Sequence, residues 1–446
     1  MNYQFPKDLY TDVRIEHVAN TAVSFTKREL RNVQVQKYSA AFIRVFDGEM
    51  WYYASTSDLD GIQGEINALA AMAKPNPNLA ENETYKRLNG HVDTMMVYEG
   101  KEVYKVELDD KIAIVQDIFP LLDANGYIKM WGASYLDEYK RKQFFNSKGA
   151  KLEFDWQQCG RGTWFDMVDG EKKHDSFITT GDVDFANLNG FYEKVKAEIV
   201  KGEDFLLNSV AVEPGVYPVI FAPDVTGVFA HECFGHKSES DFMIGDEATR
   251  KEWQLGKRVG SDELTIIETG HIPGSGYTPY DDEGNRATTT YLVKNGILTG
   301  RLHNAASAAD LGEDITGNGR AVSFEREPVV RMTTTYFDAG TRTYDELIAN
   351  TQDGILLEKY SHGSGASTFT IAPTVSYLVK DGKIDKPVRV SVVTGNVFEA
   401  LGNIDFITNK VDIRISPYSG CGKMGHFPLP TGHGGPYIRV QNMQVQ

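Results

Sequence analysis

The segment His231-Glu232-Cys233-Phe234-Gly235-His236 is the part of the sequence that most restricts how this chain can fold. In many zinc hydrolases two imidazoles hold the metal, and a carboxylate beside them takes a proton from the activated water. The familiar signature places the histidines four residues apart on one face of an α-helix, but here they lie five apart. On an ideal α-helix they would point roughly 140° apart, so they could not share one small cation.

Only a local distortion of the helix lets both imidazoles reach the same ion. A π-bulge, with its i to i+5 pattern, returns positions 231 and 236 to one face. Gly235 makes such a deviation easy for the backbone. We therefore predict that, if this segment binds metal, its helix contains a π-bulge or ends around Gly235. From the spacing alone, a helix end capped by histidines is the plainer interpretation, and it stays open at this point.

A third ligand would make a metal site more credible, and the carboxy-terminal stretch SGCGKMGHFPLPTGHGGP offers three candidates. Cys421 lies between two glycines, and a thiolate is a good zinc ligand. His426 and His433 are alternatives in the same loop, and Cys421 could also be a small buried residue in a tight turn. Three protein ligands would leave a position open for water, whereas a fourth would indicate a closed structural site.

The overall composition argues against several classes of protein. The formal charge of −16, from 46 basic and 62 acidic residues, argues against non-specific binding to nucleic acid or to anionic lipid. Three cysteines in 446 residues form no disulfide framework and suit a reducing compartment. The amino terminus lacks the pattern of a secretory signal, and no apolar run approaches a spanning length. We expect a cytoplasmic protein that binds neither nucleic acid nor membrane.

The pattern along the first part of the chain predicts an N-terminal α/β-type domain, residues 1–205, with a mixed sheet and helices. A chain of this length favours two domains, and we place their boundary near residue 205. The expected elements are strands at 39–46 and 49–56 joined by Asp47-Gly48, a helix starting at Asp58, a helix at 111–124 interrupted at Pro120, a meander of antiparallel strands over 127–182, and a helix at 186–202 closed by Gly202.

Residues 206–446 predict a mainly antiparallel β domain, barrel- or sandwich-like, that carries the metal-site helix; the fold class is thus α+β. A short apolar strand at 216–222 contains Pro218, which indicates an edge strand or a late strand start. Asp224 can cap the helix that follows. Two hairpins are expected, at 291–300 turning on Asn295-Gly296 and at 376–393 turning on Asp381-Gly382.

Several motifs in this half of the chain resemble one known family, the TldD/PmbA family, formerly described as modulators of DNA gyrase. Together they are specific, whereas any one glycine-rich piece would be a weak match. Because the chain keeps the histidine motif, it resembles the catalytic, TldD-like members. The motifs are HECFGHKSESDF (231–242), YDDEGNR (280–286), YLVKNGILTGRLHN (291–304), TGNGRA (316–321), VVRMTTTY (329–336) and CGKMGH (421–426).

The resemblance implies a cytoplasmic metallopeptidase that acts on small or unfolded peptides and forms a homodimer or a heterodimer with a related chain. It implies that His231, His236 and Cys421 hold the metal and that Glu232 is the catalytic base. Nitrogen and sulfur ligands favour one zinc ion per chain, with iron as the alternative. The chain departs from the family at His426, where glutamine is common, and in the segment PLPTGHGGP, so substrate preference is open.

Other interpretations stay open beside the peptidase. The chain could be a non-catalytic scaffold or regulatory partner with a structural metal site. Glu239 could orient a ligand imidazole, although a solvated or structural acid is the plainer interpretation. We interpret Asp281-Asp282-Glu283 as part of a turn, and residues 316–320 either as a structural loop or as donors to a peptide carbonyl.

Overall fold

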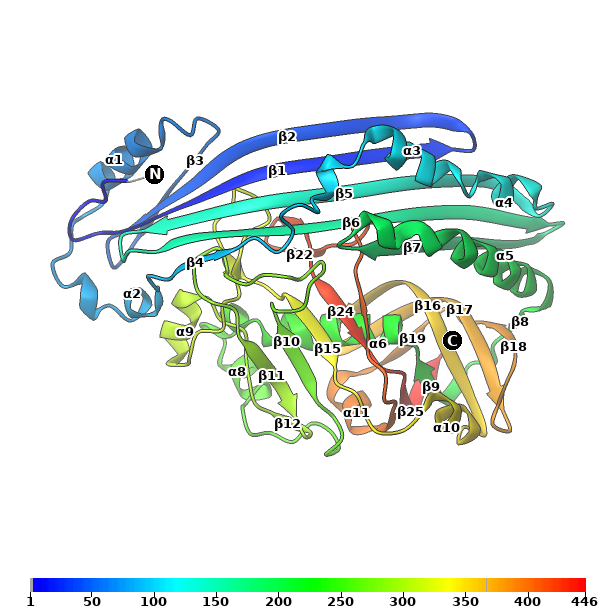
Figure 1. Cartoon of the computed structure of the whole chain (residues 1–446). Helices are drawn as coiled ribbons and strands as arrows, with labels where there is room; N and C mark the ends of the chain where they lie inside the picture. Colours follow the sequence, from blue (N-terminus) through cyan, green and yellow to red (C-terminus); the bar gives the residue numbers. More distant parts are fainter. Residues whose placement is uncertain (1–2, 366) are drawn as a thin grey trace.

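The computed structural model describes residues 3–365 and 367–446 and shows an α+β protein, as predicted. Long strands of the N-terminal sheet run across the top of the molecule, and the C-terminal half, rich in short strands, lies beneath them (Figure 1). Within the described ranges, no helix is long and apolar enough to cross a membrane.

The N-terminal sheet has the order β3-β2-β1-β5-β6, with β4 and β7 both paired to β6. All its pairings are antiparallel except that of β4 with β6. The predicted hairpin over 39–56 and the meander over 127–182 are confirmed. The strands are β1 (Tyr10–Thr26), β2 (Glu29–Phe46), β3 (Trp51–Thr56), β4 (Val92–Met95), β5 (Ile128–Asn146), β6 (Lys151–Asp169) and β7 (Lys172–Asp182).

Two helix predictions in this half need correction. The helix over 111–124 is interrupted before Pro120, which takes the second position of α4, where no hydrogen bond is lost. Gly202 does not end its helix: α5 continues to Asn208, and a Cβ at Gly202 would lie 3.0 Å from the sulfur of Met167. Position 205 lies inside α5, and the domain division there stays a prediction. The helices are α1 (Ile62–Met72), α2 (Glu83–Arg87), α3 (Leu108–Gln116), α4 (Phe119–Ala124) and α5 (Phe191–Asn208).

Five strands of the C-terminal half close into a small barrel, in the order β16-β9-β25-β19-β17 and back to β16. Short strands β18, β8 and β20 extend it. Closure pairs every strand on both sides, which removes exposed sheet edges. The bounds are β8 (Val210–Ala211), β9 (Gly215–Phe221), β16 (Asp353–Gly365), β17 (Thr368–Lys380), β18 (Lys383–Arg389), β19 (Val393–Asn396), β20 (Ile404–Ile407) and β25 (Ile438–Val445).

A second sheet of this half has the order β12-β11-β10-β15-β24-β21. Both predicted hairpins are confirmed, and their turn residues Asn295, Gly296, Asp381 and Gly382 all have positive φ. The remaining elements are β10 (Ile266–Thr269), β11 (Thr289–Lys294), β12 (Ile297–Leu298), β13 (Gly319–Arg320), β14 (Val329–Val330), β15 (Thr334–Phe337), β21 (Asp412–Arg414), β22 (Cys421–Lys423), β23 (His426–Leu429), β24 (Gly432–Gly435), α6 (Pro223–Ala230), α7 (His236–Ser238), α8 (Glu247–Glu252), α9 (Ala305–Leu311), α10 (Tyr344–Ala349) and α11 (Val397–Gly402).

Pro218 does not mark an edge strand, because β9 lies between β16 and β25. Pairing with β16 begins at Val219, directly after the proline, so the predicted late start holds on that side. On the other side the register shifts between Val440 and Met443, opposite Pro218. A bulge of this kind spares the strand a ladder hydrogen bond that proline cannot donate.

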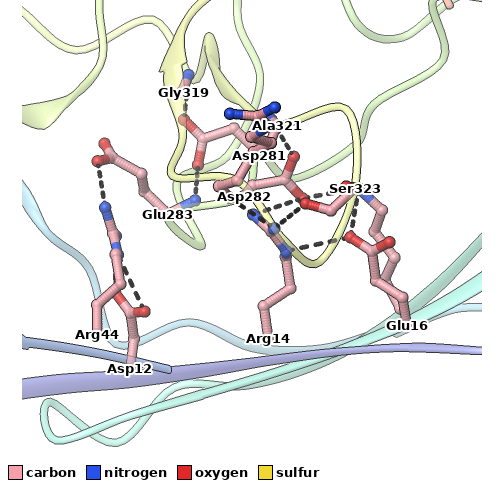
Figure 2. A network of polar contacts seen from close by, with 12 residues as sticks. Asp12, Arg14, Glu16, Arg44, Asp281, Asp282, Glu283, Gly319, Ala321 and Ser323 are labelled. Atoms are coloured by element: carbon pink, nitrogen blue, oxygen red, sulfur yellow. Dashed lines mark hydrogen bonds and ion pairs between the residues drawn. The ribbon is translucent and has the colours of Figure 1, made fainter. Parts of the chain in front are cut away.

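A buried ionic network joins the acidic turn at 281–283 to the N-terminal sheet (Figure 2). Arg44 donates to both carboxylate oxygens of Asp12 and, at 3.1 Å, to Glu283. Lys142 reaches Asp282 at 2.7 Å. The acidic run is the turn that the sequence predicts, but its side chains are buried rather than solvated. Because buried charges are tolerated only when paired, the two halves of the molecule depend on each other here.

We predict that Arg44→Met destabilises the protein by about 3–5 kcal/mol, because it leaves Asp12 and Glu283 buried without their common partner. The measurement is the urea midpoint of unfolding followed by circular dichroism. Arg258→Met is the matched control, since its ion pair with Asp262 is exposed and should contribute little. An unchanged midpoint for Arg44→Met would contradict the role given to the network.

Candidate metal centre

His231 is the first residue of a π-helical turn and His236 directly follows that turn, which is the distortion that their spacing predicts. Helix α6 (Pro223–Ala230) runs into a π turn over His231–Gly235, and α7 starts at His236. The i to i+5 pattern of this turn places positions 231 and 236 on one side of the helix. Asp224 is not the N-cap: Ala222 is, and Pro223 takes the first position, where its missing N–H has no intrahelical partner to lose.

Close packing holds the π turn on both sides. A Cβ at Gly235 would lie 1.8 Å from the sulfur of Met332, which is fully buried. On the opposite side, a Cβ at Gly365 of β16 would lie 3.1 Å from the carbonyl oxygen of Glu232. Glycine at these positions lets other segments of the protein approach the turn directly. The turn is therefore fixed by its surroundings as well as by its own hydrogen bonds.

The ligating atoms of His231, His236 and Cys421 all lie within 4.8 Å of one another. The Cys421 sulfur is 3.3 Å from Nε2 of His236, and the two imidazole centroids are 5.1 Å apart. His231 is buried, and its Nδ1 has no hydrogen-bond partner in the described part of the chain. Two imidazole nitrogens and one thiolate are a donor set that zinc prefers, and they leave a coordination position free.

The electrostatics of this cluster favour a thiolate at Cys421. Burial by itself raises the pKa of that thiol, but His231 and His236 outweigh burial and lower it to about 5. Burial by itself lowers the pKa of His236, but Cys421 and Glu239 outweigh burial and raise this pKa to about 10. Burial raises the pKa of the other two thiols, Cys159 and Cys233. Cys421 is therefore the thiol that is ready to bind a cation near neutral pH.

The remaining candidate residues have different surroundings. Glu232 is half-buried on the π turn, and its charge acts on His231. Glu239 is fully buried and accepts a hydrogen bond from Nδ1 of His236 at 3.1 Å, so the interpretation as a solvated acid is wrong. Among the described residues, neither His426 nor His433 belongs to the ligand cluster. Burial lowers the pKa of both to about 4.

The hydrogen-bond donors of the loop at 316–320 bind other parts of the protein. Arg320 donates to the backbone oxygens of Met332 and Pro430, and the N–H of Gly319 donates to Asp281. These groups are therefore occupied within the protein and are not free donors for a peptide.

A cleft of about 770 Å³ lies between β7 and the C-terminal half, and His433 is one of its lining residues, with its ring 6.0 Å from that of His231. Arg414 bridges its two walls: it donates to Asp224 at 2.8 and 3.1 Å and to Thr179 of β7 at 2.9 Å. Neither Arg414 nor Thr179 is among the site residues predicted from the sequence. No motif marks them, because they meet only when the two halves pack together.

We predict that Cys421 titrates with a midpoint near pH 5 in the metal-free protein, because two imidazoles stabilise its thiolate. The thiolate absorbance in the ultraviolet, recorded during an acid titration in the presence of a chelator, measures this midpoint. Cys421→Ser should abolish the transition, while Cys233→Ser should leave it intact. A thiolate signal that grows only at alkaline pH would refute the predicted electrostatics.

Comparisons with known proteins cover nearly the whole chain. A family model described as the PmbA/TldA metallopeptidase C-terminal domain matches residues 214–446, and one described as domain 1 of the same metallopeptidases matches residues 11–73. A metalloprotease of Synechocystis is 29% identical over 99% of this chain and 96% of that protein. A zinc metalloprotease TldD homolog of Saccharolobus solfataricus is 26% identical over 98% of this chain and 96% of that protein.

Solved structures share the fold. A Thermotoga maritima protein, described as a modulator of a DNA gyrase, aligns with a TM-score of 0.79 at 18% identity, covering 98% of this chain and 96% of that one. TldE from Thermococcus kodakarensis aligns with a TM-score of 0.77 at 16% identity, with the same coverage. With the family match over more than half of the chain and the curated relatives along nearly all of it, the chain belongs to the PmbA/TldD family as a homologue of TldD and is a metalloprotease.

Proposed function

We propose that this metalloprotease hydrolyses small or unfolded peptides, with one zinc ion held by His231, His236 and Cys421 and with Glu232 as general base. The observation that carries the proposal is the convergence of the three ligating atoms within 4.8 Å, although Cys421 is 185 residues from His236. The unpartnered Nδ1 of buried His231 and the thiolate character of Cys421 support a cation at this point.

Glu232 is placed to handle the proton of the reaction. A bound zinc ion supplies a Lewis acid, which polarises the scissile carbonyl group and lowers the pKa of water from about 15.7 towards about 7. Glu232 directly follows His231 on the π turn and is half-buried, so part of the residue is open to solvent. It takes a proton from water as the water oxygen bonds to the carbonyl carbon, and passes it to the amine nitrogen as the C–N bond breaks.

The cleft beside the metal centre supports an extended peptide as the substrate. Residues 175–181 of β7 line it, and within the described residues β7 pairs only with β6, so its other edge is free. An extended chain can bind such an edge through main-chain hydrogen bonds. A peptide that must lie along a strand edge has to be unfolded there. The homodimer or heterodimer and the cytoplasmic location stay predictions.

We predict that Glu232→Gln keeps its zinc but loses about 100- to 10,000-fold in the rate of peptide hydrolysis, because the amide cannot accept the proton. His231→Ala should lose both zinc and activity. The measurements are metal content after purification without chelator and cleavage of an unstructured fluorogenic peptide. Glu247→Gln, at the exposed start of α8, is the control and should match the wild type.

Two results would sink the mechanism. Full activity of Glu232→Gln with zinc in place would remove Glu232 from the reaction. Zinc retained by the wild type without cleavage of any unstructured peptide would favour a scaffold with a structural metal instead.

A further inference from the structure

A buried carboxylate, Glu239, links the two parts of the chain that form the metal centre. Its Oε2 lies 3.1 Å from Nδ1 of His236 and 3.2 Å from Nζ of Lys423, and none of the Glu239 residue is exposed to solvent. Lys423 follows Cys421 by two residues on strand β22. The Glu239 carboxylate thus contacts His236 directly. Through Lys423 it also contacts β22, the strand that carries Cys421.

We propose that Glu239 is a positioning residue of the metal centre: it orients the imidazole of His236 and, through Lys423, holds Cys421 beside it. This inference rests on the proposed function, because it concerns the same three ligands. It adds a specific requirement, that the distant cysteine and the helix histidine are held at their separation by a buried ion pair.

Glu239 fixes which nitrogen of the His236 imidazole faces Cys421. An ionised carboxylate only accepts hydrogen bonds, so Nδ1 of His236 must carry the proton that it shares with Glu239. When the imidazole is neutral, this arrangement leaves the lone pair on Nε2, and Nε2 is the atom that faces the Cys421 sulfur at 3.3 Å. A carboxylate behind a ligand histidine also makes the imidazole a stronger donor to a metal.

The hairpin that carries Cys421 is held in place by side-chain contacts. Within the described ranges, β22 and β23 pair only with each other and join neither of the larger sheets. Lys423, itself buried, holds this hairpin to its surroundings: it reaches Asp241 at 2.7 Å and the carbonyl oxygen of Val330 at 2.9 Å, besides Glu239. Side-chain contacts therefore replace the ladder hydrogen bonds that would otherwise fix the position of Cys421.

The backbone contacts of Glu239 do not account for its buried carboxylate. The backbone of Glu239 already has its own contacts, with an N–H bond to the carbonyl oxygen of His236 at 3.3 Å and a bridge to Leu302. Its side chain does not supply these backbone contacts, and burying a carboxylate is costly unless cations offset it. Lys423 at 3.2 Å and Arg331 at 3.8 Å supply those cations.

The test measures metal affinity rather than catalysis. Glu239→Gln keeps the size of the side chain but removes its charge, and we expect zinc binding to weaken about 10- to 100-fold in competition with a chromophoric chelator. Glu252→Gln is the matched control, because it breaks the neighbouring Glu252–Lys237 pair without touching a ligand, and it should stay within about twofold of the wild type.

Two further readouts separate positioning from folding. The ligand-field spectrum of the cobalt-substituted protein should shift in Glu239→Gln while thermal unfolding of the metal-free variant stays close to that of the control. Lys423→Gln should weaken zinc binding as well, and the double variant should lose less than the sum of the two single losses, because both act through one contact.

The outcomes distinguish the inference from the proposed function. If the wild type binds zinc tightly and Glu239→Gln binds it equally well with an unchanged cobalt spectrum, Glu239 has no positioning role and the metal centre still stands. If the wild type binds no zinc, the proposed function fails and this inference fails with it. Should Glu239→Gln not fold, Lys423→Gln alone decides, and unchanged zinc affinity in that variant would overturn the link to Cys421.

Discussion

The extra residue in the helical turn that begins at His231 is the constraint on which the rest of the metal centre depends. In a regular α-helix the two imidazoles would point roughly 140° apart. The π turn brings them to one side, with centroids 5.1 Å apart. Such turns are rare and need support from their surroundings. Here Met332 packs against Gly235 on one side and β16 passes close to Glu232 on the other.

Support for this turn extends to the boundary between the two halves of the molecule. The acidic turn at 281–283 is anchored to the N-terminal sheet by Arg44 (Figure 2) and by Lys142. The same turn accepts hydrogen bonds from the N–H groups of Gly319 and Ala321. Arg320 of that loop donates to the carbonyl oxygen of Met332, and Met332 packs against Gly235, so buried polar contacts and one apolar contact connect the long strands of the sheet to the π turn. The fold and the site thus share one set of interactions.

Local patterns predicted much of the fold, and the failures have physical causes. The hairpins at Asn295-Gly296 and Asp381-Gly382 were predictable, because their turns demand those residues. Strand β1 and the outer part of β2 were missed. Residues 29–37 are exposed along their whole length, and their apolar positions, such as Val33 and Val35, alternate with polar ones without facing a core. Gly202 was misread as a helix end, and of the two alternatives at Pro218 the edge strand was wrong, because close packing and a bulge use the same residues.

The sequence alone determined the types of donor, the five-residue spacing and hence the need for a distorted helix, because these depend on the geometry of one continuous segment. Local patterns left Cys421, His426 and His433 open and only the family resemblance favoured Cys421; the tertiary structure groups Cys421 with the helix histidines and leaves the other two outside the ligand cluster. It also decided that Glu239 is buried against His236 and Lys423. Those outcomes depend on how segments far apart in the sequence pack together, as Cys421 and His236 do at a separation of 185 residues, and no local pattern records that.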